Sequence, residues 1–101
     1  MSINNIFPVE ENESFTDVMD EVSTGVKFGS KVILFDDNIH TFVEVVNQII
    51  KATGYTEEVA FYHTMNVHTK GKSEVYKGNT LDCINVSDVL REINLKTQVV
   101  S

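Results

Sequence analysis

Two carboxylates and an amide stand side by side in this sequence, and an imidazole follows two positions later. Asp36, Asp37, Asn38 and His40 come directly after the apolar run 32–35. Turn chemistry alone would explain the Asp and Asn residues, because both hydrogen-bond to nearby backbone amides. The alternative is a cation site. An ammonium group fits such a site better than a bare metal ion, because it has three donors and needs only about three acceptors.

Metal binding is a second chemistry to consider, since the chain has three histidines, His40, His63 and His68. His63 and His68 are five residues apart, which places them roughly 140° apart around a helix, so they do not face one zinc ion. A calcium loop of the EF-hand type is excluded by the missing glycine and distal Glu. We expect no metal and no cofactor. A different kind of function, a small metal-dependent enzyme, stays open as a hypothesis. Its metal ligands would be Asp36, Asp37, His40 and His68.

Catalytic signals are otherwise absent from the sequence. It contains no glycine-flanked nucleophile and no glycine loop that would hold a phosphate. Cys83, the single cysteine, falls on the inward face of an expected helix, where buried cysteines are usually inert. A chain with a single cysteine cannot form an intramolecular disulfide or a cysteine-based zinc site, and such a chain suits a reducing compartment. We therefore expect a protein that is not an enzyme.

Composition and charge narrow the class of protein further. The 101 residues suffice for one domain, and the net charge of −7 is concentrated in residues 1–24, which have six acids and no Lys or Arg. Neither residues 1–24 nor the rest of the chain has the excess of Lys and Arg that binding to nucleic acid requires. No apolar run is long enough to span a membrane and no signal peptide is apparent. We expect a cytoplasmic monomer with a flexible acidic arm, 1–28, and a folded domain, 29–101.

Periodicity and capping signals predict an α+β domain. Thr41 and Glu44 form a capping box that begins a helix, which Gly54 ends, and Thr56 can cap the next helix. The preceding apolar run reads as a central strand that is buried on both faces. Together the patterns predict a small three-stranded antiparallel sheet, covered on one face by three helices. The expected order is β-α-α-β-α-β, with strands at 31–35, 73–77 and 95–100 and helices at 41–54, 56–68 and 81–93.

Two separated motifs in this chain resemble the ClpS family, the adaptors of the AAA+ protease Clp. The first runs from Lys31 to Phe42 and reads KVILFDDNIHTF, and the second runs from Val67 to Lys72 and reads VHTKGK. The likeness covers roughly residues 30–100. It implies a binding module without chemistry of its own, which recognises N-degron peptides with a large apolar first residue. The implied partner is an AAA+ Clp unfoldase of the ClpA or ClpC type.

The resemblance also implies roles for particular residues. By position, Asp36, Asp37 and His68 would hold the α-amino group of the substrate, in agreement with the ammonium site argued above. The side chain of the first residue would lie in a pocket whose wall includes Asn38, Ile39, His40, Phe42, Thr64, Met65 and Val67.

The chain departs from the family pattern in three places. Asp36 stands where the family has an Asn, so this side chain accepts hydrogen bonds but does not donate them. Thr64 stands where many members have a methionine that shapes the pocket entrance. The early turns of the third helix have Leu81, Ile84 and Asn85 in place of a Glu and a Lys that contact the unfoldase. These departures motivate a second hypothesis, a ClpS-like interaction domain that has lost degron binding, in which Asp37→Ala leaves partner binding unchanged.

Overall fold

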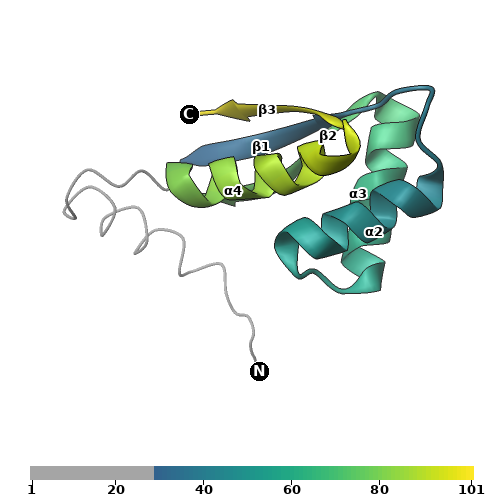
Figure 1. Ribbon diagram of the computed structural model, residues 1–101, viewed down its shortest axis with the longest axis horizontal. Helices are drawn as coiled ribbons and strands as arrows, with labels where there is room; N and C mark the ends of the chain where they lie inside the picture. The colour runs from purple at the N-terminus through teal and green to yellow at the C-terminus, as the bar shows by residue number, and fades with distance from the viewer. Residues whose placement is uncertain (1–28) are drawn as a thin grey trace.

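The structure, a computed structural model, describes residues 29–101, so the predicted acidic arm lies outside the described residues. A three-stranded antiparallel sheet and three α-helices follow one another in the order β-α-α-β-α-β (Figure 1). The helices lie on one side of the sheet, with α4 along the strands and α2 and α3 packed together beside them. The predicted α+β architecture is confirmed.

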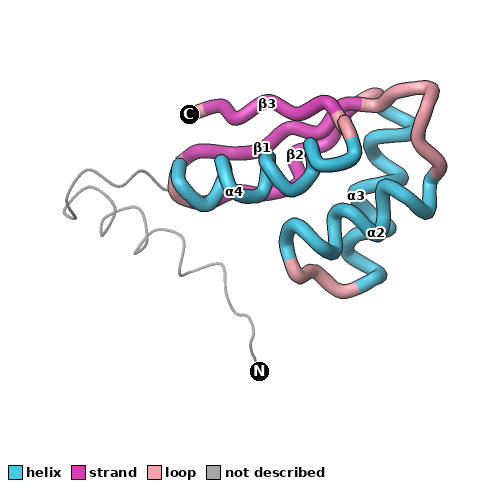
Figure 2. The backbone as a smooth tube through the Cα atoms, in the orientation of Figure 1, coloured by secondary structure: helices cyan, strands magenta, loops and turns pink. Residues whose placement is uncertain are grey.

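The boundaries of the elements agree with the predicted ones to within a few residues (Figure 2). The second helix continues two residues past His68 to Lys70, where Gly71 ends it with a left-handed φ of 89°. The third helix stops at Leu90, and a short 3-10 helix, η1, covers the rest of the predicted span. The elements are β1 Ser30–Phe35, α2 Phe42–Thr53, α3 Glu57–Lys70, β2 Lys72–Gly78, α4 Thr80–Leu90, η1 Arg91–Ile93 and β3 Lys96–Val100.

The central strand is buried on one face only, which corrects the prediction of burial on both. β1 pairs with β2 on one side and β3 on the other. Val32 and Leu34 are fully buried under the helices, whereas Ile33 and Phe35 point to the other face and are partly exposed. Ile33 and Phe35 have polar partners across the sheet, namely Glu74, Gln98, Lys72 and Lys96. An apolar run therefore does not by itself reveal whether both faces of a strand are covered.

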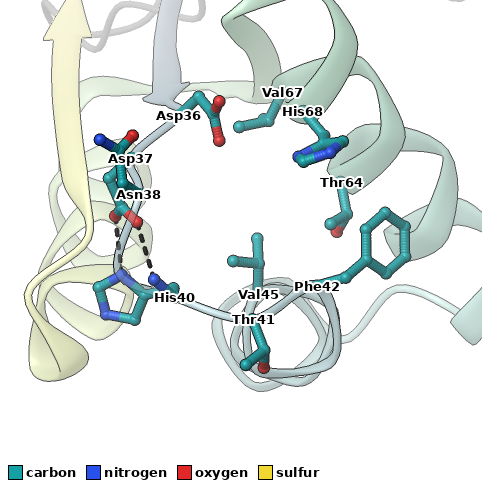
Figure 3. A pocket seen from close by; sticks show the side chains of 10 residues that line it. All are labelled: Asp36, Asp37, Asn38, His40, Thr41, Phe42, Val45, Thr64, Val67 and His68. Atoms are coloured by element: carbon teal, nitrogen blue, oxygen red, sulfur yellow. Dashed lines mark hydrogen bonds and ion pairs between the residues drawn. The ribbon is translucent and has the colours of Figure 1, made fainter.

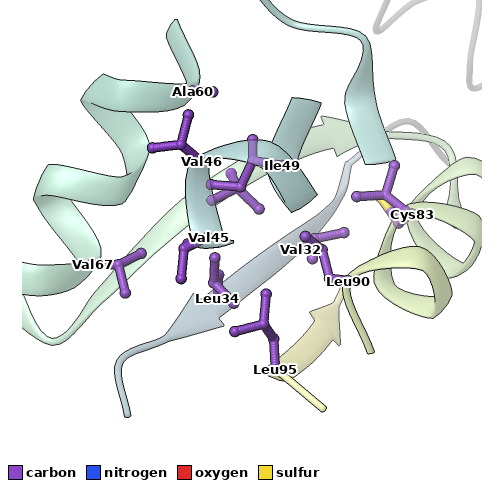
Figure 4. Close-up of a cluster of buried hydrophobic side chains, with 12 residues drawn as sticks. Val32, Leu34, Val45, Val46, Ile49, Ala60, Val67, Cys83, Leu90 and Leu95 are labelled. Atoms are coloured by element: carbon purple, nitrogen blue, oxygen red, sulfur yellow. The ribbon is translucent and has the colours of Figure 1, made fainter. Parts of the chain in front are cut away.

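One apolar core joins all the elements (Figure 4). Its largest fully buried side chains include Leu34 of β1, Ile49 of α2 and Leu90 of α4. Val45 and Val67 bring the facing sides of α2 and α3 into the same cluster. The end of β1 thus shares one core with both of these helices, and the loop that follows β1 leads directly into α2.

The helix signals in the sequence act as predicted. The Glu44 amide donates to the Thr41 hydroxyl at 3.1 Å, and the Thr41 amide donates to the Glu44 carboxylate at 2.8 Å, which completes the capping box. Gly54 ends α2 with a left-handed φ of 79°. Only residues 36–41 separate β1 from α2, so the polar turn is held tightly at both ends. None of the helices in residues 29–101 is long and apolar enough to cross a membrane.

Candidate functional site

A cavity of about 200 Å³ lies between the polar turn, the start of α2 and the end of α3 (Figure 3). The turn supplies its polar side and the two helices supply its apolar side. Most of the residues singled out in the sequence meet here, although they are up to 32 positions apart. The lining residues are Asp36, Asp37, Asn38, His40, Thr41, Phe42, Val45, Thr64, Val67 and His68.

Asp36 and His68 approach the cavity from opposite sides with their polar groups toward it (Figure 3). The backbone amide of Asp36 donates to the Gly71 carbonyl at 2.9 Å, which ties the end of β1 to the turn that ends α3. His68 lies two residues before that end, so the same hydrogen bond sets the relative position of the two side chains. Within residues 29–101, neither the Asp36 carboxylate nor the His68 imidazole makes a hydrogen bond, so both can contact a ligand.

The Asp37 carboxylate is turned toward the loop itself (Figure 3). Its Oδ1 accepts hydrogen bonds from the backbone amides of Ile39 and His40, both at 2.9 Å. Its Oδ2 lies 2.7 Å from Nδ1 of the His40 ring. A carboxylate offers about four acceptor positions, and three of them are used here. Asp37 therefore holds the turn together and retains little capacity for another donor.

His40 bridges the turn to the far end of the chain. Its Nδ1 contacts the Asp37 carboxylate, and its Nε2 donates to the carbonyl oxygen of Ile93 in η1. An ionised carboxylate and a carbonyl only accept hydrogen bonds, so both ring nitrogens must carry a proton for the two contacts to form. The geometry therefore corresponds to an imidazolium ion, paired with Asp37.

Charge and burial act together on this pair. The hydrogen bond to Asp37 and then the one to the Ile93 carbonyl raise the pKa of His40 above its ordinary value, against a smaller effect of burial. Burial raises the pKa of Asp37, but the hydrogen bonds from His40 and Ile39 outweigh it together and hold that pKa below its ordinary value. Both shifts favour the charged forms. Over the intermediate pH range the Asp37 carboxylate and the His40 imidazolium thus form an ion pair that stabilises the turn.

The apolar side of the cavity is continuous with the core. Val45 and Val67 are core residues that also line the cavity. Thr64 is buried, and its hydroxyl donates to the Ala60 carbonyl at 2.8 Å, so its donor is already used. Phe42 is half-buried and meets the His68 ring edge to face, with ring centroids 6.4 Å apart. This surface suits an apolar side chain better than a polar one.

Two of the residues predicted for the pocket wall do not line this cavity. Ile39 is 83% exposed at the tip of the turn, and Met65 is 39% exposed on another side of α3. Thr41 and Val45 line the cavity although they were not assigned to it. Val45 could have been found from its position, because it lies three residues after Phe42 on the same helix face. No sequence signal marks Thr41 as a lining residue, because its role as a helix cap accounts for it.

A metal-ligand set is not formed by the residues that the structure describes. Among residues 29–101 no group of three or more His, Cys, Asp and Glu side chains is arranged to hold a metal ion. His40 is engaged by Asp37 and Ile93, and His63 lies 3.1 Å from the Ser73 hydroxyl on the sheet side of α3. The hypothesis of a metal-dependent enzyme built on Asp36, Asp37, His40 and His68 therefore gains no support from the geometry.

The structure is a small α+β domain whose cavity has a polar side and an apolar side, and a comparison with known protein families identifies the class to which it belongs. Residues 29–98 match the family of the ATP-dependent Clp protease adaptor protein ClpS. This chain belongs to the ClpS family, which is a family of adaptors and not of catalysts.

A solved structure shows the same fold. ClpS2 of Agrobacterium tumefaciens, determined bound to L-phenylalaninamide, matches with a TM-score of 0.66 at 14% identity, over 70% of this chain and 93% of the other. No curated protein sequence matches the chain.

Proposed function

We propose that this adaptor binds the free N-terminal residue of degradation substrates and delivers them to an AAA+ Clp unfoldase of the ClpA or ClpC type. The proposal rests mainly on the side chains of Asp36 and His68, which face one cavity and make no hydrogen bond within residues 29–101. A carboxylate and an imidazole together can accept hydrogen bonds from an α-ammonium group. Asp37 contributes its negative charge and its one remaining acceptor position.

The dimensions of the cavity support a single side chain as the ligand. Its volume of about 200 Å³ is below the range of roughly 300–1,000 Å³ that is usual for whole small molecules. Phe42, Val45 and Val67 offer apolar contacts, so a large apolar side chain is favoured. L-phenylalaninamide, the ligand of the similar ClpS2 structure, has a free α-amino group and an apolar ring, and it is a ligand of this kind.

Fluorescence titration with peptides that differ only at the N-terminus tests the proposal. Peptides that start with Phe, Leu, Tyr or Trp should bind, and their N-acetylated forms should bind at least about tenfold more weakly, because a charged hydrogen bond contributes about 1.5–3 kcal/mol. Asp36→Ala and His68→Ala should cause a loss of similar size. Thr69→Ala is the matched control, since Thr69 is exposed beside His68 and does not line the cavity. Equal binding of free and acetylated peptides would refute the proposal.

Delivery needs a second interaction, with the unfoldase. We expect the purified chain to sediment as a monomer, to act in the cytoplasm, and to form a complex with purified ClpA or ClpC. Sedimentation velocity of the mixture measures this complex directly. If the adaptor sediments as a free monomer in the mixture with ClpA and in the mixture with ClpC, this half of the proposal is contradicted.

One observation favours the alternative of a ClpS-like interaction domain without degron binding. The carboxylate of Asp37, which the family resemblance assigns to the α-amino group, is largely occupied by His40 and the backbone. That alternative predicts that Asp36→Ala and Asp37→Ala leave binding of its partner unchanged. The same titration separates the two, because a domain without degron binding shows no preference for a free apolar N-terminus.

A further inference from the structure

A second, larger hollow lies directly beside the cavity, between α2 and the first turns of α3. Its volume is about 430 Å³, and it is open on one side. The apolar lining comes from Phe42, Val43, Val46 and Phe61. Val43 of α2 and Phe61 of α3 are 64% and 50% exposed, so the groove presents an apolar surface to solvent. This hollow is called the α2–α3 groove below.

Phe42 lines both hollows, so the cavity and the groove are adjacent to each other. On one side its ring meets His68 of the cavity, and on the other it meets Phe61 of the groove, with centroids 5.0 Å apart and an angle of 63° between the rings. An extended peptide advances about 3.3 Å per residue. A peptide held by its α-amino group beside His68 can therefore reach the groove with its second or third residue.

The groove also has a defined charge. Glu57 and Glu58 line it at the start of α3, and none of its lining residues is a Lys or an Arg. Apolar walls with a carboxylate rim match a side chain that has an apolar stem and a cationic end, as in Lys and Arg. Phe61 also lines the groove, and an aromatic ring attracts a cation that lies over its face. An acidic side chain would meet like charges at the same place.

We propose that the α2–α3 groove is a second subsite, which receives a Lys or Arg side chain at position 2 or 3 of a bound N-degron peptide. This inference rests on the proposed function, because it needs the peptide to be anchored in the cavity by its first residue. It adds a selectivity that the first cavity cannot give, namely for the residues that follow the N-terminus. The groove would thus sort substrates that share the same first residue.

The test uses the full chain and fluorescent peptides that begin with Phe and carry Lys, Ser or Glu at positions 2 and 3, with the label at the far end. Lys peptides should bind about two- to fivefold more tightly than Ser peptides, and Glu peptides more weakly, as expected for partly exposed ion pairs. Glu57→Gln with Glu58→Gln should abolish the difference. Asp82→Asn with Asp88→Asn on α4 is the control with the same change in net charge, and it should preserve the difference.

The outcomes separate the two proposals. If free Phe peptides bind better than acetylated ones but Lys, Ser and Glu peptides bind alike, the subsite is refuted and the proposed function stands. If the Lys preference survives Glu57→Gln with Glu58→Gln, it comes from the overall charge of the protein and the subsite is again refuted. If acetylation has no effect, the proposed function fails and the subsite fails with it. Phe61→Ala, at a half-exposed position, should weaken the binding of Lys peptides more than the binding of Ser peptides.

Discussion

At the scale of single residues, two neighbouring aspartates with the same side chain have different surroundings. The Asp36 carboxylate points into the cavity and makes no hydrogen bond within residues 29–101, whereas the Asp37 carboxylate accepts three hydrogen bonds within its own turn. His40 makes this difference, because its ring occupies one oxygen of Asp37 and its Nε2 holds the turn against η1. We therefore propose that Asp36 and His68 would make most of the direct contact with an α-amino group, whereas Asp37 and His40 hold the shape of the turn.

The His40–Asp37 pair predicts a pH dependence of stability. The pKa of His40 is raised in the folded state, so its contribution is complete below its unfolded pKa of about 6.5 and is lost as the pH rises through the higher folded value. The pKa of Asp37 is lowered, so its contribution is lost only in acid, as the pH falls through that lowered value. The pair should stabilise the fold most between about pH 4 and 6.5.

Urea unfolding of the protein and of His40→Ala at pH 5.5 and pH 9 checks this dependence. The difference in free energy of unfolding between the two proteins should be about 1–2 kcal/mol larger at pH 5.5. Comparing the two proteins at each pH cancels the titration of His63, whose pKa is lowered by burial and which therefore acts in the opposite sense. A difference that does not vary with pH would mean that His40 is neutral in the folded protein.

At the scale of elements, the site depends on how α3 ends. Gly71 has a φ of 89°, and its carbonyl accepts the Asp36 amide at 2.9 Å. This left-handed residue turns the chain from α3 into β2, and it places the end of β1 beside His68. A side chain at this position would have room, because no atom lies within 4 Å of an added Cβ, so its cost would come from the backbone conformation.

Gly71→Ala tests this coupling between the helix end and the site. The substitution should destabilise the fold by about 1–2 kcal/mol, the cost of a left-handed conformation for a residue with a Cβ, and should weaken peptide binding by displacing Asp36. Gly54→Ala is a matched control, because Gly54 also has a left-handed φ, of 79°, and free space, but it ends α2 away from the cavity. Denaturant unfolding and peptide titration of both variants measure the two effects. Equal affinities for the two variants would refute the coupling.

At the scale of the whole molecule, one core supports both sides of the cavity. Leu34 is fully buried at the end of β1, and Val45 and Val67 belong to the same cluster and also line the cavity. The floor of the cavity is therefore the surface of the core. The opposite face of the sheet has no helix over it within residues 29–101, so stability must come from this single apolar layer.

Leu34→Ala measures how much the fold depends on that layer. We expect a loss of about 2–5 kcal/mol in the free energy of unfolding, as for other fully buried leucines whose removal leaves a cavity. Urea denaturation followed by circular dichroism gives the value. Ile33→Ala, next to it on the partly exposed face of the same strand, is the control and should cost clearly less. Equal losses at the two positions would contradict the one-sided core.

The sequence predicted the order of elements because the local signals were strong. Thr41, Glu44, Gly54 and Thr56 begin or end helices by interactions within a few residues, and these interactions form as expected. The one-sided burial of β1 could not be predicted, since it depends on where helices distant in sequence are packed. The same holds for Met65 and for the hydrogen bond between His40 and Ile93, which joins residues 53 positions apart. Local interactions could therefore be predicted from the residues themselves, whereas the placement of His68 near Asp36 was predicted only from the family resemblance.

The central claim is that Asp36 and His68 bind a free α-amino group. Its most direct test is chemical-shift mapping of the ¹⁵N-labelled full chain with L-phenylalaninamide and with its N-acetyl form. The account predicts that the free amine shifts the amides of Asp36, Phe42 and His68 in a saturable manner, and that the acetylated form leaves them nearly unchanged. Equal shifts with both compounds, or saturable shifts confined to residues away from this cavity, would contradict it.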